Sequence, residues 1–385
     1  MLTHVAGMAA FLTVPVLAPV IGTELGVPLK LAGVYTAVCY LGYCFTSPFA
    51  GGLVRRLGGV RTCQLCLLGI AGGLALAVTA TPEFALPVLF ASAFVAGVGH
   101  GPLTAAGSQL LHLVAPERRR ALLFSVKQTG TPLGVVMIGA ISPTLAQEIG
   151  WHSTLIVTAA LVLGIGVLMQ PLRRIHDAAR DPEHQVTLKG ALQELKLFRE
   201  DATLRALTLA AMAYGCSQFC FSAFFVVYQV EALQITHIDA GINLSIAQAA
   251  GAAGRVLWGV VADQWRPWRV LIAIGIGTGL AGIAMALANP TWPGPLVTAS
   301  AIALGATAIG WNGVLLSETA RAAPQRAAAA TGMLATLFAM AMVVAPTVFS
   351  ALVGLTGSYD TGFLACAMLA FAGAAALANA RRPPP

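Results

Sequence analysis

The sequence predicts an all-α membrane protein with twelve transmembrane helices, arranged as two pseudo-symmetric bundles of six. Two features of the composition support this class: 57% of the 385 residues are hydrophobic and only 10% are charged. Soluble domains carry about a quarter charged residues, so this chain could not cover a globule with a water-compatible surface. The third observation is a repeat, because the glycine- and arginine-rich stretch Gly51–Arg61 returns as Gly259–Arg269, at an offset of 259 − 51 = 208 residues.

Twelve apolar segments can be drawn, and many reach the roughly 20 residues that a helix needs to cross a bilayer. They lie near residues 4–23, 31–50, 63–80, 84–112, 121–146, 152–171, 205–229, 239–262, 270–288, 295–317, 327–350 and 361–380. We therefore predict an N-terminal bundle over 1–171, a cytoplasmic linker over 172–204 and a C-terminal bundle over 205–385. The first segment is followed by Pro28-Leu29-Lys30 rather than by a small-residue cleavage site, which favours a spanning helix over a signal peptide.

The basic residues predict the orientation. If the N-terminus is cytoplasmic, 19 of the 22 lysines and arginines fall on inside segments, and only Lys30 falls outside. The positive-inside rule then places both termini in the cytoplasm. The net charge of +7 is explained by this topology, so we expect no nucleic-acid partner. The two remaining basic residues, Lys127 and Arg255, lie within apolar helices.

No residue pattern indicates a metal site, a cofactor or a catalytic centre. The seven cysteines lie mostly in apolar segments, and Cys63-x-x-Cys66 has no second pair to complete a metal site. The membrane segments hold no metal-spaced His/Glu cluster and no Ser/His/Asp set, so we do not expect an enzyme.

The 208-residue offset extends to the loops. Pro82 and Pro87 correspond to Pro290 and Pro295 at matching outer loops, and Ala115-Pro116-x-Arg118 corresponds to Ala323-Pro324-x-Arg326 at matching inner loops. A repeat of six helices against six in the same orientation indicates a parallel duplication of the kind found in one large class of transporters.

The turn Gly51-Gly52-Leu53-Val54-Arg55-Arg56-Leu57-Gly58 resembles the signature between helices two and three of the major facilitator superfamily. That signature is a Gly-x-Leu-Ala-Asp-Arg-x-Gly-Arg-Arg-like turn, and here Arg55 stands in place of its aspartate, whereas the second copy has Asp263. The resemblance covers essentially the whole chain. It implies the major facilitator fold and a secondary transporter that works by rocker-switch alternating access.

Other family motifs are incomplete. The fourth-helix motif has an arginine four residues before a glycine, whereas Gly97 here is preceded by Ala93. The exporters' glycine-proline motif in helix five is present only in part, as Gly130-Thr131-Pro132-Leu133-Gly134. Neither proton coupling nor export follows from these motifs.

In such folds the inner turns act as gates. The repeat symmetry would bring Asp263 near the start of helix five, around Arg118–Ala121, where the helix dipole favours a carboxylate. Arg55 would approach the start of helix eleven, where a cation gains nothing from the dipole. We therefore expect unequal gates, with Asp263 the firmer latch. The alternative is that Asp263, Arg55, Arg56 and Arg61 mark topology and packing only.

Lys127 and Arg255 are the main predicted substrate-binding residues, since a charge at a helix centre costs about 2.5–3.5 kcal/mol on insertion scales. All fifteen acidic residues can be placed in loops or at helix ends, so we expect these cations to meet an anion from outside. Arg255, four residues before Gly259, resembles helix eight of monocarboxylate and oxalate–formate carriers, where that arginine binds the substrate carboxylate. The alternatives are that Arg255 braces helix ends and that Lys127 snorkels to the surface.

Further polar residues lie on helices that usually line the cavity, and they complete the predicted site: His100, Gln128, Tyr214, Gln218, Trp311 and Asn312. His100 is the candidate for titration near neutral pH. We expect symport of a small organic anion, a monocarboxylate, with protons. The protein would act as a monomer among the lipids of the bacterial cytoplasmic (inner) membrane. The alternative is efflux of an amphipathic compound through an apolar cavity lined by Phe11, Phe221 and Phe225.

Overall fold

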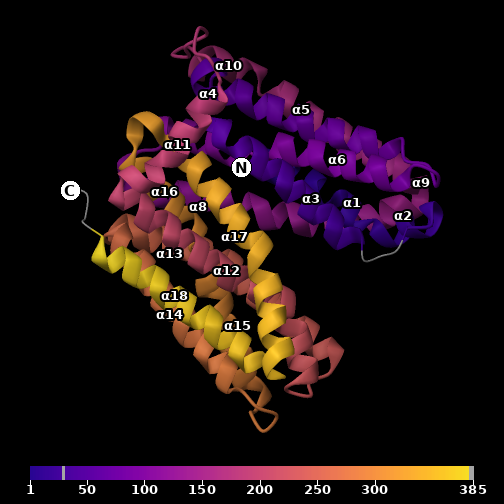
Figure 1. Ribbon diagram of the computed structural model, residues 1–385, viewed down its shortest axis with the longest axis vertical. Helices are drawn as coiled ribbons and strands as arrows, with labels where there is room; N and C mark the ends of the chain where they lie inside the picture. The colour runs from indigo at the N-terminus through magenta and orange to yellow at the C-terminus, as the bar shows by residue number, and fades with distance from the viewer. Residues whose placement is uncertain (28–30, 381–385) are drawn as a thin grey trace. The chain divides into compact units, whose positions relative to one another are not determined.

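The computed structural model describes residues 1–27 and 31–380, most of which lie in helices (Figure 1). Lys30, Arg381 and Arg382, which were counted for the orientation, lie outside the described residues. A bilayer offers the backbone no water to bond with, so a spanning segment satisfies its amides and carbonyls internally as a helix. The all-α membrane fold predicted from the sequence is therefore confirmed.

The chain divides into two compact units. Unit 1 comprises residues 1–114, 127–197 and 323–339, and unit 2 comprises the remaining described residues. Each unit thus contains one short segment from the opposite half of the sequence. The predicted division at 1–171, 172–204 and 205–385 follows the repeat rather than these units, and it stays a prediction.

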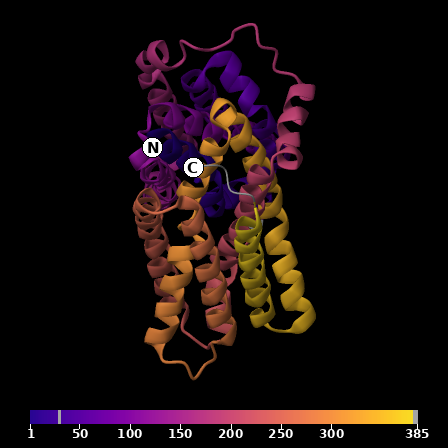
Figure 2. The ribbon, with the colours of Figure 1, turned by 90° about the vertical axis from the view of Figure 1, so that its left-hand side faces the viewer.

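Unit 1 is built from the first half of the chain and the linker. Its elements are α1 (Leu2–Val16), α2 (Ala18–Leu25), α3 (Leu31–Thr46), η1 (Ser47–Phe49), α4 (Ala50–Leu57), α5 (Gly59–Val78), α6 (Ala85–His100), α7 (Leu103–Val114), α9 (Gly130–Leu168), α10 (Gln170–His176), most of α11 (Leu188–Glu200), η3 (Pro324–Arg326) and the start of α17 (Ala327–Thr356). Figure 1 shows α1, α3, α5, α6 and α9 packed side by side, and Figure 2 shows the segment between α10 and α11 as an extended trace.

Unit 2 is built mainly from the second half of the chain. Its elements are η2 (Glu117–Arg119), most of α8 (Arg120–Gln128), α12 (Ala202–Glu231), α13 (His237–Gln264), α14 (Pro267–Leu287), α15 (Gly294–Ala308), α16 (Asn312–Ala322), the rest of α17 and α18 (Tyr359–Asn379). Side chains begin several of these helices: Asp201 caps α12 and Ser358 caps α18, each by accepting from backbone N–H groups of the first turn.

The number of crossings agrees with the predicted twelve. Among the described residues, ten helical stretches are long and apolar enough to cross a membrane, and the bent pair α1 and α2 adds an eleventh. One of the ten, Glu117–His176, has 60 residues. At 1.5 Å per residue it would span about 90 Å, three times the hydrocarbon thickness. Its backbone leaves helical geometry at Gly150, where φ is 80°, so it counts as two crossings.

Besides the bent pair α1 and α2, four crossings in the described part of the chain are interrupted, and two of these interruptions are related by the repeat. The helix pair α6–α7 breaks at Gly101, and the pair α15–α16 breaks at Ile309, 309 − 101 = 208 residues later. The pair α8–α9 breaks at Thr129, and α3 passes into α4 through η1. Broken helices expose backbone carbonyls and amides inside a membrane protein, which is where transporters commonly place their sites. The interruptions are therefore the first place to look for a substrate site.

Candidate functional site

Arg255 lies at one of these interruptions, inside unit 2. Its side chain is only 5% exposed, and its Nε donates to the Ile309 carbonyl at 3.1 Å, where α15 ends. Helix α13 approaches this point closely because Gly251 and Gly254 face Ile309 and Ala306 without side chains. Arg255 is thus held inside the protein and does not face lipid.

Three more predicted residues gather around the same break. Asn312 donates through Nδ2 to the Ile309 carbonyl at 3.4 Å and to Gln218 Oε1 on α12 at 3.3 Å. The ring of Trp311, which is 2% exposed, lies edge-on to Tyr214, with the ring centroids 6.0 Å apart. The carbonyl of Ile309 therefore joins Arg255 to Asn312, and Asn312 in turn bonds Gln218, so the three side chains form one polar cluster.

Tyr214 belongs to the packing around this cluster. Its side chain is fully buried, and its hydroxyl donates to the Leu271 carbonyl of α14 at 3.0 Å. Helix α14 admits the ring because Gly275 has no side chain there. The hydroxyl group of Tyr214 thus forms a hydrogen bond within the protein, and its ring packs against Trp311.

Lys127 lies in unit 1, at the interruption between α8 and α9. It is 5% exposed, and its Nζ donates to Ser108 Oγ at 2.8 Å and to the Thr104 carbonyl at 3.2 Å, both on α7. The ammonium group is therefore directed into the bundle, which argues against snorkelling to the surface. Gln128, the next residue, is also buried.

His100 is the last residue of α6, one turn before Thr104. Its ring lies 4.8 Å from that of Phe11 and 5.8 Å from that of Tyr43, measured between centroids. Within the described part of the chain, its buried Nδ1 has no hydrogen-bond partner. A histidine in this setting is a neutral ring packed among aromatics, with one nitrogen able to take a proton or a ligand.

His4 is a residue that the sequence did not single out. It is 4% exposed, and the Cβ that Gly107 lacks would lie 3.2 Å from His4 Cε1 and 3.6 Å from Lys127 Nζ. The imidazole and the ammonium group therefore flank the same glycine of α7. Nothing in the sequence indicated a role for His4, because only the packing of α1 against α7 brings this residue to Lys127.

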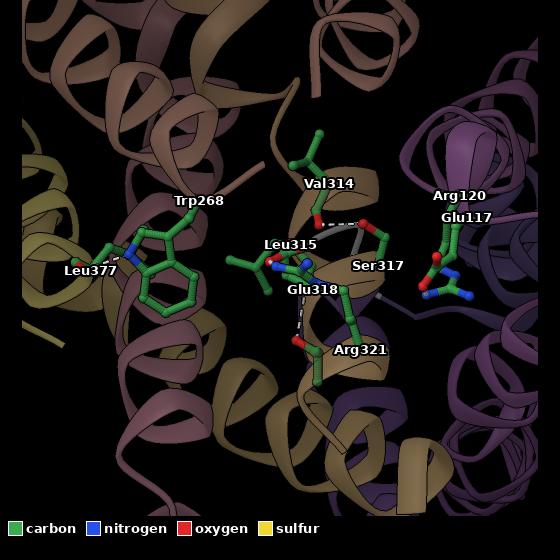
Figure 3. A network of polar contacts seen from close by, with 10 residues as sticks. Glu117, Arg120, Trp268, Val314, Leu315, Ser317, Glu318, Arg321 and Leu377 are labelled. Carbon is green, nitrogen blue, oxygen red and sulfur yellow. Dashed lines mark hydrogen bonds and ion pairs between the residues drawn. The ribbon is translucent and has the colours of Figure 1, made fainter. Parts of the chain in front are cut away.

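The expectation that every acidic residue lies in a loop or at a helix end was wrong for Glu318. This residue of α16 is 4% exposed and pairs with Arg321 Nη2 at 2.8 Å (Figure 3). The helix runs one turn beyond the predicted segment 295–317, which brings the carboxylate inside. The ion pair with Arg321 compensates the negative charge of Glu318, so the buried carboxylate is not left unpaired.

Asp263 lies where the repeat predicted it. Its Oδ1 accepts from the Ala121 N–H at 2.8 Å and its Oδ2 accepts from the Leu122 N–H at 2.9 Å, both in the first turn of α8 within unit 2. A carboxylate here satisfies two amides that have no intrahelical partner and lies at the positive end of the helix dipole. The predicted approach of Asp263 to the start of helix five is confirmed.

The matching start of α17 is held differently. The Ala328 N–H donates to Gln109 Oε1 at 3.1 Å, whereas Arg55 pairs with Asp181 at 3.2 Å and remains exposed. Arg56 is also exposed, and Arg61 donates through Nη1 to Gln64 at 3.3 Å. The start of α17 is therefore capped by the neutral amide of Gln109 through one hydrogen bond. The start of α8 is capped by the carboxylate of Asp263 through two hydrogen bonds.

Two linker residues supply carboxylates to the first copy of the turn. Asp177 is 1% exposed and accepts from the N–H groups of Val60 and Arg61, both at 2.9 Å, at the start of α5. Glu194 of α11 accepts from the Gly51 N–H at 3.3 Å, at the start of α4. A Cβ at Gly51 would displace this carboxylate and would lie 2.7 Å from Ala329 Cβ, so the close packing favours glycine there. The linker is thereby fastened to unit 1 at two helix starts.

We expect the docking of α11 on the start of α4, which Glu194 mediates, to weaken as the pH rises. Burial raises the pKa of Glu194 to about 7 from 4.5, against the lowering effects of the Gly51 and Gly52 N–H groups and of Arg326. A raised pKa in the docked state stabilises docking fully below pH 4.5, and this contribution is lost as the pH rises to about 7. Between pH 6 and pH 8, docking of α11 should weaken about tenfold. The rate of proteolytic cleavage in residues 178–187 measures this change.

Glu194→Gln is the control, because the amide keeps the shape of the side chain and has no titration in this range. Its cleavage rate, measured with the same protease at both pH values, should supply the baseline. A native-to-variant rate ratio that stays constant from pH 6 to pH 8 would contradict the prediction.

Comparison with known proteins gives one family. The family model described as Major Facilitator Superfamily matches residues 1–346. The probable sulfoacetate transporter SauU of Cupriavidus necator is 27% identical over 94% of this chain and 88% of its own length. Human monocarboxylate transporter 12 is 23% identical over 82% of this chain and 67% of its own length. The E. coli fucose:proton symporter FucP is 16% identical, and its crystal structure superposes with a TM-score of 0.77 over 97% of both chains.

Proposed function

This chain belongs to the major facilitator superfamily, and from that premise we propose that it transports a small organic anion, a monocarboxylate, together with a proton. As a member of that family it is a multi-pass membrane transporter and not an enzyme. The observation that carries the proposal is the burial of Arg255 at the helix interruption, beside Asn312 and Gln218. A guanidinium group is a planar fork of N–H donors, and Arg255 Nε donates to the Ile309 carbonyl, which fixes where this fork lies.

The chemistry of the cluster suits a carboxylate. Guanidinium and carboxylate form paired, charge-assisted hydrogen bonds, which gain strength away from water. Asn312 and Gln218 add neutral amides that can bond further oxygens of a small substrate. Within unit 1, Lys127 is a second buried cation at an interruption of its own helix. An anion that binds a buried cation would balance a charge whose burial is otherwise costly.

The relatives support an anionic substrate. The names of the two curated relatives give sulfoacetate and monocarboxylates as their substrates. Both substrates carry a carboxylate. The proton would travel either on the substrate or through His100, whose Nδ1 can take it up beside Phe11 and Tyr43.

The proposal includes a membrane location and an orientation. The excess of arginine and lysine on one set of loops supports an orientation with both termini in the cytoplasm. We infer a bacterial inner-membrane protein that acts as a monomer by rocker-switch motion of its two sequence halves. Phe11, Phe221 and Phe225, which the efflux alternative requires in an apolar cavity, are each at most 2% exposed and pack in the hydrophobic cores. No observation therefore favours efflux.

Uptake into proteoliposomes tests this function. Purified protein reconstituted in vesicles should accumulate at least one labelled small carboxylate, such as lactate, pyruvate, acetate or sulfoacetate. An inward proton gradient should increase the rate, and collapse of the gradient with a protonophore should return it to the baseline. Stimulated uptake of a neutral amphipathic dye, with no carboxylate transported, would instead establish the efflux alternative.

A further inference from the structure

Unit 1 contains a polar cavity whose lining includes neither Lys127 nor Arg255. It has a volume of about 440 Å³ and lies at the basic helix ends, between α4, α7, the linker and the start of α17. Its size is within the range of small-molecule sites. The residues that decide its chemistry are three arginines and two histidines, Arg55, Arg180, Arg326, His176 and His184, and two acids, Asp177 and Glu194.

The two acids, Asp177 and Glu194, already accept hydrogen bonds from backbone N–H groups at helix starts. Both oxygens of Asp177 accept backbone N–H groups of α5, and Glu194 accepts the Gly51 N–H of α4. Their charges are therefore partly neutralised by the helix dipoles. Arg326 acts electrostatically on Glu194, so the two acids offset part of the positive charge of the three arginines.

The arginines of the cavity form fewer hydrogen bonds and ion pairs than its two acids. Arg180 reaches only the Asp177 carbonyl, at 3.5 Å, and in the described part of the chain neither Arg180 nor Arg326 forms an ion pair with a carboxylate. Arg55 pairs with Asp181 in an exposed geometry that contributes little. Arg55, Arg180 and Arg326 thus line the cavity with hydrogen-bonding capacity left over.

We propose that this cavity binds a small anion with two or more negative charges, a phosphate or a phosphate ester. Planar guanidinium groups bond phosphate oxygens in pairs, and the ring N–H groups of His176 and His184 are further donors in the lining. The phosphate can come from a soluble compound or from a lipid headgroup, since the cavity lies at the helix ends. A phosphate group differs from the carboxylate of the proposed substrate in its tetrahedral shape and its additional acceptor oxygens, so this ligand is chemically distinct from the proposed substrate.

Binding should strengthen as the pH falls. The acid in the cavity that titrates near neutrality is Glu194, because burial raises its pKa to about 7. It faces Gly51 and Gly52 of α4 and Arg326 before α17, while Asp177, Arg180, His176 and His184 come from the linker and Arg55 from α4. Protonation of Glu194 removes a negative charge that would repel an anion in the cavity.

Titration calorimetry with pyrophosphate tests the site in the full-length protein in detergent. We expect one saturable site that weakens at least tenfold in the double variant Arg180→Gln/Arg326→Gln. The matched control is Arg174→Gln, which removes an exposed arginine of α10 outside the cavity and should bind as the native protein does. Arg255→Gln should also leave pyrophosphate binding unchanged, so failure of the proposed transport function would not affect this result.

A second arm identifies the source of the phosphate. The protein in nanodiscs of phosphatidylcholine, with or without phosphatidylglycerol, is titrated with pyrophosphate. If the lipid headgroup fills the cavity, phosphatidylglycerol should compete with pyrophosphate in the native protein. If a soluble phosphate is the ligand, affinity should be the same in both lipids. Equal pyrophosphate affinity in the native protein and the double variant, or no saturable binding in detergent and in either nanodisc, would overturn the proposal.

Discussion

Arg255→Gln should reduce uptake of the transported anion by about a hundredfold. The variant removes a buried positive charge and its paired donors, and loss of one partner of a buried charge pair costs about 2–5 kcal/mol. At 1.4 kcal/mol for each factor of ten, about 3 kcal/mol corresponds to two orders of magnitude in kcat/KM. Initial rates of uptake in proteoliposomes, taken over a range of substrate concentrations, measure the change.

Two further variants separate substrate binding from bracing of the helix end. Arg255→Lys keeps the charge and loses the planar fork, so it should retain more uptake than Arg255→Gln while remaining below native. Trp258→Phe removes the bond from Trp258 Nε1 to the Ala306 carbonyl, 2.9 Å long, and leaves every charge in place. If Arg255 only braces the end of α15, Trp258→Phe should impair uptake as strongly as Arg255→Gln. Native rates in a well-folded Arg255→Gln protein would refute the assignment of Arg255 to the substrate.

The sequence predicted those parts of the molecule that follow from polarity in an apolar chain and from the repeat. Arg255, Asn312 and Gln218 could be identified because a polar side chain inside a membrane helix needs a partner, and the structure joins them through Ile309. The position of Asp263 at the start of α8 followed from the 208-residue symmetry alone. The first inference needs only the cost of a polar side chain within one membrane helix, and the second needs only the repeat, so neither requires knowledge of the tertiary packing.

Other parts could not be predicted because they depend on tertiary packing. Asp177 and Glu194 are unremarkable acids in a charged linker, and only the return of the linker to unit 1 brings them to helix starts. Gln109 carries no charge, so nothing marked it as the partner of Ala328. Glu318 was missed because the end of a helix cannot be placed to within one turn from hydrophobicity.

Asp263→Asn should shift the conformational equilibrium toward the state that opens at the basic helix ends. Asparagine offers one acceptor oxygen where the carboxylate bonds both Ala121 and Leu122, and it has no charge to interact with the dipole of α8. The loss of one charged hydrogen bond and of the dipole term amounts to about 1–2 kcal/mol, which is a five- to thirtyfold change in the equilibrium. Distances between spin labels at Thr81→Cys and Thr291→Cys, in two of the predicted outer loops, report the populations by pulsed electron resonance.

Gln109 provides the matched comparison at the other helix start. Gln109→Ala removes a single neutral bond to Ala328, so its shift should have the same direction as that of Asp263→Asn and a smaller size. Gln109→Glu places a carboxylate at the start of α17 and should shift the populations in the opposite direction, because it restores the kind of contact that Asp263 makes. An unchanged distance distribution in Asp263→Asn, or an equal shift in Gln109→Ala, would show that the two ends do not differ as latches. The replacement of an aspartate by Arg55 in the first turn would then affect linker attachment rather than gating, since Arg55 pairs with Asp181.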